Sequence, residues 1–275
     1  MAQSSYLERR GQIEAYFDRT AADAWARLTS DAPVSGVRAT VRAGREQMRR
    51  LLVGWVASAG AADRYGASGP GLPQSASHAR VPHPALSADH EHAHGAGPAT
   101  PLLSKAILDA GCGTGLLAID CARLGAAVTA IDLSPTLVDL ARERLPADLA
   151  PGSVRLLSGD MLDPALGEFD HLVAMDSLIH YAPEQAVSAL VTLAPRIGSS
   201  MVFTFAPGNL PLRAMIAVGR LFPRGDRSPS IVPVAPERMQ RLLGDALGPL
   251  GWRLGRSERV SRGFYTSQAQ ELVRG

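Results

Sequence analysis

The sequence predicts an α/β protein built on a mostly parallel, doubly wound sheet with helices on both faces. From residue 105 onward, short apolar runs rich in β-branched residues alternate with segments of helical periodicity. Strict alternation of strand and helix implies right-handed crossovers between parallel neighbours. The chain has 275 residues, of which 46% are hydrophobic and 20% charged, so it is long and apolar enough for one buried core with appendages.

Residues 1–57 are expected to form an N-terminal helical arm. Apolar residues recur at steps of three and four from Leu7 to Leu28 and again from Val37 to Val56, so each segment has one apolar helix face. Two interpretations of these helices stay open. They either only pack against the sheet or also close over a substrate.

Residues 58–104 differ in composition from the rest of the chain. They consist mostly of Gly, Pro, Ala, Ser and His with almost no branched apolar side chain, so they cannot bury enough surface to offset their chain entropy. We therefore expect a disordered insertion. His90, His92 and His94 alternate in the run DHEHAH, but a segment without a fixed backbone does not hold metal ligands in a defined geometry, and no metal site is expected.

The core is expected over residues 105–275, with its elements in the order that a doubly wound sheet requires. The strands are predicted at 105–109, 127–132, 154–157, 169–175 and 200–205, and the helices at 114–124, 135–145, 184–193 and 236–247. The residues from Trp252 to Gly275 are expected to add an antiparallel pair, and residues 207–235 to form a lid.

A glycine-rich loop follows the first strand, at the edge where doubly wound sheets bind ligands. In DAGCGTG, Asp109 precedes glycines at 111, 113 and 115, which let the backbone pass close under a ligand. The third glycine comes one residue earlier than in GxGxxG, so the loop fits an amino-acid moiety better than a pyrophosphate. Asp132 ends the second strand 19 residues after Gly113, where an acid binds ribose hydroxyls. Asp160 ends the third strand, with Met161 beside it.

The two cysteines do not indicate further chemistry. Cys112 and Cys121 lack the spacing of a zinc site, and two cysteines cannot form a disulfide framework. We interpret Cys112 as a small residue in a tight loop rather than as a nucleophile, and Cys121 as a packed helix residue.

The string ILDAGCGTG resembles motif I of the class I S-adenosylmethionine-dependent methyltransferases, which have a Rossmann-like fold. The resemblance implies that S-adenosylmethionine is the methyl donor, with Asp132 at the ribose, Asp160 at the adenine amino group and Met161 beside the ring. The cofactor-binding residues expected on this basis are Asp109, Gly111, Gly113, Gly115, Asp132, Leu133, Asp160, Met161 and Asp176.

Longer strings narrow the resemblance to one family. EAYFDRTAADAWARL, DSLIHY, VGRLFPRGDRSP and RGFYTSQAQELV are similar to the magnesium-protoporphyrin IX O-methyltransferases of bacteriochlorophyll biosynthesis, across the chain except for about residues 57–104. The resemblance implies that one propionate of magnesium-protoporphyrin IX is methylated, with magnesium only as part of the substrate. A methyltransferase with another small-molecule acceptor and a non-catalytic porphyrin carrier remain as alternatives.

Candidate catalytic residues lie at the exit of the fourth strand and in the arm. His180 follows that strand, where it either donates a hydrogen bond to the carboxylate or ligates the magnesium. In this family, members from oxygenic organisms carry a catalytic tyrosine four residues after the arm's tryptophan, where this chain has Thr29 after Trp25. Tyr16 is considered as its substitute, or else as a packing partner of Phe17.

The predicted lid supplies an apolar surface for a flat macrocycle, and its arginines offer forked donors to the propionates. These arginines are Arg213, Arg220, Arg224 and Arg227.

Charge and hydropathy limit the expected partners. The 28 Lys and Arg against 26 Asp and Glu give a net charge of +2, which provides no field suited to nucleic acid. There is no secretory pattern and no run of 18 apolar residues, so we expect a cytoplasmic protein, with peripheral contact to the photosynthetic or inner membrane through the lid. The resemblance adds the large porphyrin-binding subunit of magnesium chelatase as an expected partner.

Overall fold

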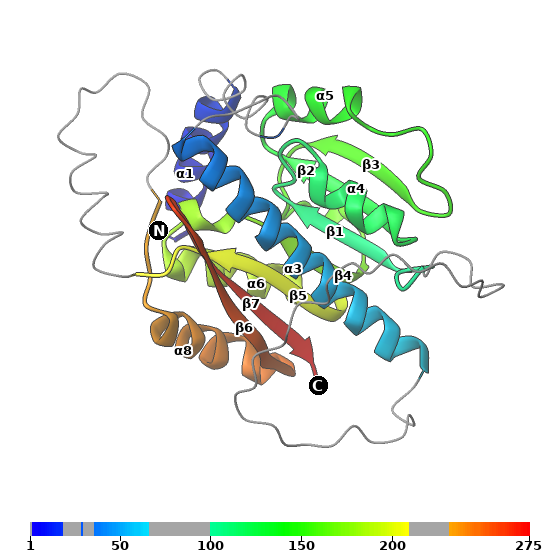
Figure 1. The fold of residues 1–275 in the computed structure, drawn as a ribbon. Coiled ribbons are helices and arrows are strands. Elements are labelled where there is room, and N and C mark those ends of the chain that lie inside the picture. The colour runs from blue at the N-terminus through cyan, green and yellow to red at the C-terminus, as the bar shows by residue number, and fades with distance from the viewer. Residues whose placement is uncertain (1, 19–28, 30–35, 66–99, 209–230) are drawn as a thin grey trace.

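The computed structural model describes residues 2–18, 29, 36–65, 100–208 and 231–275 (Figure 1). Within them, one seven-stranded sheet has the order β3-β2-β1-β4-β5-β7-β6. Strands β1 to β5 run parallel, and β7 lies antiparallel between β5 and β6. The strands are β1 (Ala106–Ala110), β2 (Ala127–Asp132), β3 (Ser153–Ser158), β4 (Phe169–Ala174), β5 (Ile197–Phe205), β6 (Trp252–Arg262) and β7 (Tyr265–Arg274). The predicted doubly wound fold with its closing antiparallel pair is confirmed.

Helices cover both faces of this sheet, with α3 and α4 on one face and α6 and α8 on the other (Figure 1). The α-helices are α1 (Ala2–Tyr16), α3 (Val37–Tyr65), α4 (Leu116–Arg123), α5 (Pro135–Glu143), α6 (Pro183–Leu193) and α8 (Pro236–Leu247). The short 3-10 helices are η3 (Pro164–Leu166), η4 (Leu178–His180), η5 (Ala194–Arg196) and η6 (Gly248–Leu250).

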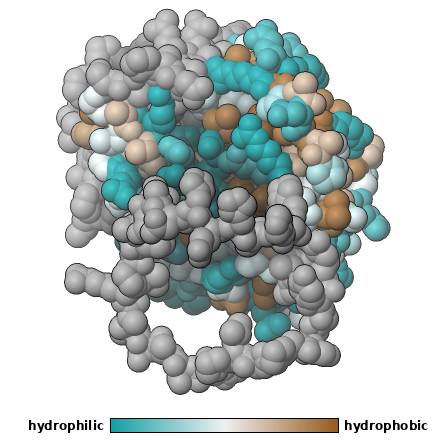
Figure 2. All heavy atoms as spheres, turned by 45° about the vertical axis from the view of Figure 1, so that its right-hand side comes forward, coloured by the Kyte–Doolittle hydropathy of each residue, from teal (hydrophilic) through white to brown (hydrophobic). Residues whose placement is uncertain are grey.

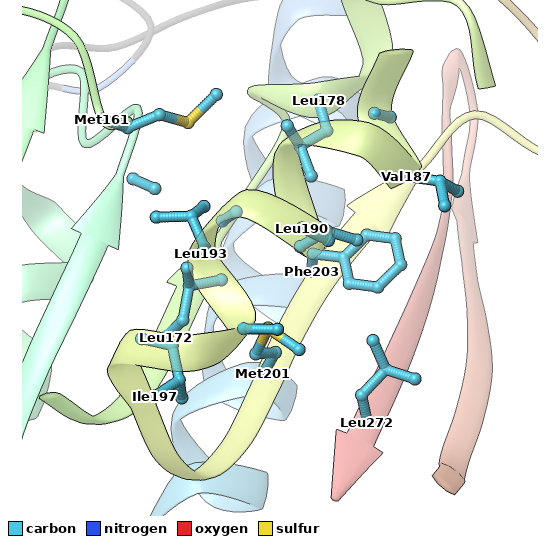
Figure 3. Close-up of a cluster of buried hydrophobic side chains, with 14 of the residues drawn as sticks. Met161, Leu172, Leu178, Val187, Leu190, Leu193, Ile197, Met201, Phe203 and Leu272 are labelled. Carbon is cyan, nitrogen blue, oxygen red and sulfur yellow. The ribbon is translucent and has the colours of Figure 1, made fainter. Parts of the chain in front are cut away.

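Alternate side chains of the central strands enter two different cores. In β1, Ile107 packs in the core formed with α3 and α4, whereas Leu108 packs in the core formed with α6 and α8, and both are fully buried. This is the period of two expected of a strand between two helical layers. Figure 3 shows the second core, where Leu190 of α6 lies beside Phe203 of β5. Burial of a side chain of this size contributes about 1.5–3 kcal/mol to folding.

Local sequence signals place several element ends where they were predicted. Ser134 precedes α5, and its Oγ accepts a hydrogen bond from the Leu137 amide at 3.2 Å. Pro135 occupies the first helical position, where the missing N–H has no helical partner to lose. Strand β2 and helix α8 have the predicted bounds.

The second arm helix is longer than predicted. Helix α3 continues to Tyr65, past the expected end of the arm at residue 57, and therefore enters the segment predicted to be disordered. The extension is rich in alanine, which favours a helix without giving the branched apolar signal that marks a buried face. At the other end of that segment, Leu102 is fully buried in a turn before β1. The histidine tract and the rest of residues 66–99 lie outside the described residues.

The surface of the described residues mixes polar and apolar groups. Figure 2 shows hydrophilic and hydrophobic side chains interspersed on one face of the molecule. In the part of the chain that the structure describes, no helix is long and apolar enough to cross a membrane. The same residues contain no group of three or more His, Cys, Asp or Glu side chains placed to hold a metal ion.

Candidate functional site

A cavity of about 330 Å³ lies at the carboxyl ends of β1, β2, β3 and β4. This is the edge at which the sequence placed the ligand site. The cavity is lined by the glycine-rich loop after β1, by the acids that follow β2, β3 and β4, and by side chains of α1 and α3 from the N-terminal arm. The arm therefore borders the cavity as well as packing on the sheet, as the second interpretation of these helices requires.

The glycine loop adopts a backbone that other residues rarely accept. Gly111, Gly113 and Gly115 have φ values of 83°, 53° and 76°. A Cβ on Gly111 would lie 2.3 Å from the Ser177 Cβ, so the loop and the exit of β4 are in direct contact. A Cβ on Gly113 would meet nothing within 4 Å, because that residue borders the cavity. Gly115 is not among the lining residues, and a Cβ there would lie 3.2 Å from the Ala141 Cβ of α5.

Asp109 supplies a buried carboxylate at the base of the loop. The residue is 1% exposed and lines the cavity, and none of the described residues donates a hydrogen bond to its Oδ2. Burial, together with the neighbouring Asp132, raises the pKa of Asp109 to about 7. A carboxylate in this environment is stabilised by a cation, so Asp109 fits the ammonium group of the amino-acid part of S-adenosylmethionine.

The acids after β2 and β3 also line the cavity, together with Leu133 and Met161. Asp132 fixes the glycine loop, because its Oδ2 accepts a hydrogen bond from the Gly113 amide at 2.8 Å. Burial raises the pKa of Asp132. Asp160 accepts a hydrogen bond from the Leu162 amide at 2.9 Å and forms an ion pair with Arg10 of α1 at 2.8 Å. The structure thus brings these predicted cofactor residues together around one cavity, where their carboxylates can accept hydrogen bonds from hydroxyl and amino groups.

The candidate catalytic residues differ in their position. His180 lies in η4, is 5% exposed and lines the cavity, and its ring meets Phe17 edge-on with 5.6 Å between centroids. Tyr16 packs edge-on against the same Phe17 ring at 5.2 Å and is not among the lining residues. Thr29 does line the cavity, and its hydroxyl accepts a hydrogen bond from Arg144 at 2.8 Å. The packing interpretation of Tyr16 is therefore the one that the geometry favours.

The predicted lid is described only at its two ends. The Gly208 amide donates to the Val234 carbonyl at 2.7 Å, and the Val234 amide donates to the Ala206 carbonyl at 3.0 Å. The Val232 amide donates to the Ile179 carbonyl at 2.9 Å, so this end of the segment is fixed beside His180. The four lid arginines, at positions 213, 220, 224 and 227, lie outside the described residues.

Neither cysteine has the environment of a nucleophile. Burial and the nearby Asp109 raise the pKa of the Cys112 thiol, and burial also raises the pKa of Cys121. Both thiols are therefore protonated at neutral pH, in agreement with their interpretation as packing residues.

Sequence reasoning missed the polar face of α3 as part of the site. Arg42, Arg45, Glu46 and Arg49 line the cavity. Their spacing of three, four and seven places them on one helix face, so the signal was present as a charged stripe on an amphipathic helix. Such a stripe usually faces solvent, and only the tertiary packing of α3 turns it toward the cavity.

Two family models match the chain in succession. The model described as Methyltransferase domain covers residues 107–197, and the model described as Magnesium-protoporphyrin IX methyltransferase C-terminus covers residues 174–274. A magnesium-protoporphyrin O-methyltransferase from Rhodobacter capsulatus is 41% identical over 269 residues, which span 98% of each chain. The chain belongs to the magnesium-protoporphyrin O-methyltransferase family.

The fold also matches that of a solved member of the family. The crystal structure of magnesium protoporphyrin IX methyltransferase from Synechocystis PCC 6803 with bound SAH matches with a TM-score of 0.71 at 26% identity, covering 96% of this chain and 99% of that chain. A ubiquinone biosynthesis O-methyltransferase from Thiobacillus denitrificans is 33% identical over 152 residues, but this match covers only 52% of this chain. The family and the class I methyltransferase fold predicted from the sequence are both confirmed.

Proposed function

We propose that this chain transfers the methyl group of S-adenosylmethionine to one propionate of magnesium-protoporphyrin IX. The products are the monomethyl ester and S-adenosylhomocysteine. The observation that carries this proposal is the 41% identity over 98% of the chain, because it includes the arm and the C-terminal segment as well as the cofactor core. A relative that methylates a different acceptor shares only about half of the chain.

Methyl transfer to a carboxylate requires that the carboxylate be positioned, and it does not require a catalytic base. A propionic acid has a pKa of about 4.3, like a glutamate side chain, so the acceptor is already an anion at neutral pH. One of its oxygens forms the new bond to the methyl carbon as the sulfur–carbon bond breaks, and no proton moves. When bound, S-adenosylmethionine supplies an electrophilic methyl group on a positively charged sulfur. The protein must strip water from the carboxylate and hold the oxygen about 3–3.5 Å from that carbon.

Five side chains of the cavity have a proposed task in this scheme. Asp109 accepts hydrogen bonds from the ammonium group, Asp132 from the ribose hydroxyls and Asp160 from the adenine amino group. Phe17, together with the other apolar lining, excludes water from the reacting carboxylate. His180, held between Phe17 and the exit of β4, donates a hydrogen bond that fixes the carboxylate oxygen.

The role of His180 has a direct test, because the alternative is axial ligation of the magnesium. We expect His180→Ala to lower kcat about 10- to 100-fold while the Kd for S-adenosylmethionine changes little. The loss should be the same with magnesium-protoporphyrin IX and with metal-free protoporphyrin IX. A loss confined to the metalloporphyrin would assign His180 to the metal instead.

The proposed acceptor is tested by comparing two classes of substrate. Purified protein is mixed with S-adenosylmethionine and either magnesium-protoporphyrin IX or a catechol-type quinone precursor, and the products are identified by mass spectrometry. We expect a mass increase of one methyl group on the porphyrin alone. Methylation of the phenol alone would favour the other-acceptor alternative, and porphyrin binding without any product would favour the carrier.

We also propose that the substrate is delivered by the large porphyrin-binding subunit of magnesium chelatase, and that the chain works in the cytoplasm with peripheral membrane contact. The apolar face of the macrocycle and the apolar residues of the predicted lid support this arrangement. Co-sedimentation with vesicles containing anionic lipid, with and without the chelatase subunit, tests both parts. Recovery of the chain only in the supernatant would contradict membrane contact.

A further inference from the structure

Asp176 has an unusual backbone at the exit of β4. Its φ is +54°, and among the described residues Ser104 is the only other non-glycine with a positive φ. Such a conformation is unfavourable for most L-residues and persists where the surroundings hold it in place. Asp176 stands between β4 and η4, four residues before His180. Its backbone therefore sets the direction in which the chain enters the turn from Ser177 to His180.

The carboxylate of Asp176 is held from several sides. Its side chain is 6% exposed and forms an ion pair with Arg45, with 2.5 Å between Nη1 and Oδ2. The Tyr265 hydroxyl lies 3.2 Å from both carboxylate oxygens, and the Ser267 hydroxyl donates to Oδ1 at 3.2 Å. Thr204 accepts a hydrogen bond from the Asp176 amide at 2.7 Å and donates to Oδ1 at 3.1 Å. Both carboxylate oxygens are therefore already engaged within the protein.

These partners come from three different elements, α3, β5 and β7. Arg45 belongs to the arm helix α3, and Tyr265 belongs to the closing strand β7. A Cβ on Gly44 would lie 2.5 Å from the Tyr265 ring, so α3 approaches this tyrosine more closely than a side chain would allow. Burial and the nearby Asp176 raise the pKa of Tyr265, which keeps its hydroxyl protonated as a donor. Asp176 thus joins the arm helix α3 to the closing strand β7.

On its other side, the Asp176 segment rests on the glycine loop. The hydroxyl of Ser177 donates to the Ala110 carbonyl at 2.8 Å. Its Cβ leaves no room for a side chain on Gly111. A displacement of the backbone at Asp176 would therefore move the contact with the cofactor loop and the start of η4 together.

We infer that Asp176 is a positioning residue, which holds the turn from Ser177 to His180 over the glycine loop through its bonds to Arg45, Tyr265, Ser267 and Thr204. This inference rests on the proposed function, since the positioned group is the histidine proposed to orient the carboxylate. It differs from the sequence-based expectation that Asp176 binds the cofactor. The arm helix then contributes to the reaction through Arg45.

A second contact of helix α3, with Arg256 of β6, offers a matched control. Arg256 of β6 forms an ion pair with Glu271 at 2.5 Å, and the Glu271 side chain is 4% exposed. Arg256 also donates to the Trp55 carbonyl of α3 at 3.0 Å. Trp55 lies about 15 Å along the helix from Arg45 at 1.5 Å per residue. None of Arg256, Glu271 and Trp55 lines the cavity. Arg45 and Arg256 therefore both anchor α3, Arg45 through its ion pair with Asp176 and Arg256 through its hydrogen bond to the Trp55 carbonyl. Only Arg45 is connected to the turn from Ser177 to His180.

The experiment compares Asp176→Asn, Arg45→Gln and Tyr265→Phe with the control Arg256→Gln. Asparagine tolerates a positive φ, so Asp176→Asn removes the charge without changing the backbone preference. Tyr265 is not a lining residue, so Tyr265→Phe removes one hydroxyl without touching a ligand. We measure kcat, the Kd for S-adenosylmethionine by calorimetry, and the melting temperature of each variant.

We expect kcat to fall about 10- to 100-fold in Asp176→Asn and Arg45→Gln and by a smaller factor in Tyr265→Phe, because small displacements of a reacting geometry have effects of this size. The Kd for S-adenosylmethionine should change less than about threefold, well under the tenfold that 1.4 kcal/mol would produce. The double variant Arg45→Gln with Asp176→Asn should be no slower than the slower single variant, because the two residues act as one unit. Arg45→Lys should restore part of the rate. Arg256→Gln should lower the melting temperature with kcat unchanged.

Either of two results on binding and turnover would overturn the inference. A rise in Kd as large as the fall in kcat would make Arg45 or Asp176 a cofactor ligand, and an equal fall in kcat in Arg256→Gln would reduce the network to a general anchor of α3.

Hydrogen exchange separates this inference from the proposed function, because it needs no turnover. Amides of residues 177–181 should exchange faster in Tyr265→Phe than in the parent protein and should not change in Arg256→Gln. Unchanged exchange in Tyr265→Phe would contradict the inference, whereas failure of the parent protein to methylate the porphyrin would contradict only the proposed function.

Discussion

The two helices of the N-terminal arm, each predicted to have one apolar face, differ in their attachment to the sheet. Helix α3 inserts Met48 and Leu52 into the core at 0% exposure. It is also held by the ion pair of Arg45 with the buried Asp176 carboxylate and by the hydrogen bond from Arg256 of β6 to the Trp55 carbonyl. Of the side chains described in α1, only Ile13 is buried. The α1 segment makes polar contacts to the loops of the cavity, among them the ion pair between Arg10 and Asp160. Helix α3 is thus part of the scaffold, whereas α1 covers the cavity.

The largest effect should come from the scaffold helix. Leu52→Ala removes a fully buried side chain, and we expect the free energy of unfolding to fall by about 2–5 kcal/mol. Ile13→Ala should cost less, because α1 can detach without opening the core. Denaturant unfolding of both variants measures the difference. Equal losses would show that α1 belongs to the same cooperative unit as α3 and would break the comparison.

The floor of the cavity should respond to pH, in contrast to its helical cover. The raised pKa of Asp109, about 7, means that the carboxyl is neutral below this pH and charged above it. A cationic ligand binds the charged form, so the Kd for S-adenosylmethionine should fall as pH rises from 6 to 8, by up to about tenfold per pH unit below the pKa. Asp109→Asn should bind weakly at every pH. Calorimetry measures both, and a Kd independent of pH in the parent protein would contradict the assignment.

The raised pKa of Asp109 also makes the stability of the fold depend on pH. Cofactor binding should strengthen as pH rises, whereas stability should fall. Because folding favours the neutral form of Asp109, its contribution to stability is fully present below the unfolded pKa and is lost as pH rises through about 7. The parent protein should therefore lose stability relative to Asp109→Asn between about pH 4 and pH 7, and added S-adenosylmethionine should remove this difference.

The cover helix should have a smaller effect on binding. The ion pair of Arg10 with Asp160 is partly exposed, with 32% and 22% of the two side chains accessible, so it contributes at most about 1 kcal/mol. Arg10→Ala leaves an Asp160 oxygen available to the adenine amino group, and we expect the Kd for S-adenosylmethionine to fall by up to about fivefold with no change in melting temperature. A large drop in melting temperature would show that α1 is a structural support.

The segment that joins the arm to β1 should have the smallest effect. Deleting residues 67–98 shortens the connection, and loop length changes the closure free energy by only about 0.6 kcal/mol per doubling. We expect unchanged turnover. Loss of activity in a folded deletion variant would assign a function to this segment.

The comparison also shows what could be predicted from the sequence. The alternating core, the glycine loop and the acids after successive strands depend on local pattern, and the sheet brings the strand ends together by topology alone. Asp176 was recognised as a site residue for the same reason. Its partners Tyr265 and Ser267 follow it by about 90 residues, on a strand that pairs with β5, and no local pattern connects them. The charged stripe of α3 was visible, but its direction depends on where the helix packs.

Methyl transfer to the porphyrin carboxylate is the central step of the proposed function. A single turnover with S-adenosylmethionine labelled with carbon-13 at the methyl group, and with magnesium-protoporphyrin IX as acceptor, measures this step. We expect the label to appear in one methyl ester of the porphyrin, together with one equivalent of S-adenosylhomocysteine. Binding of both ligands with the label remaining on S-adenosylmethionine would contradict it.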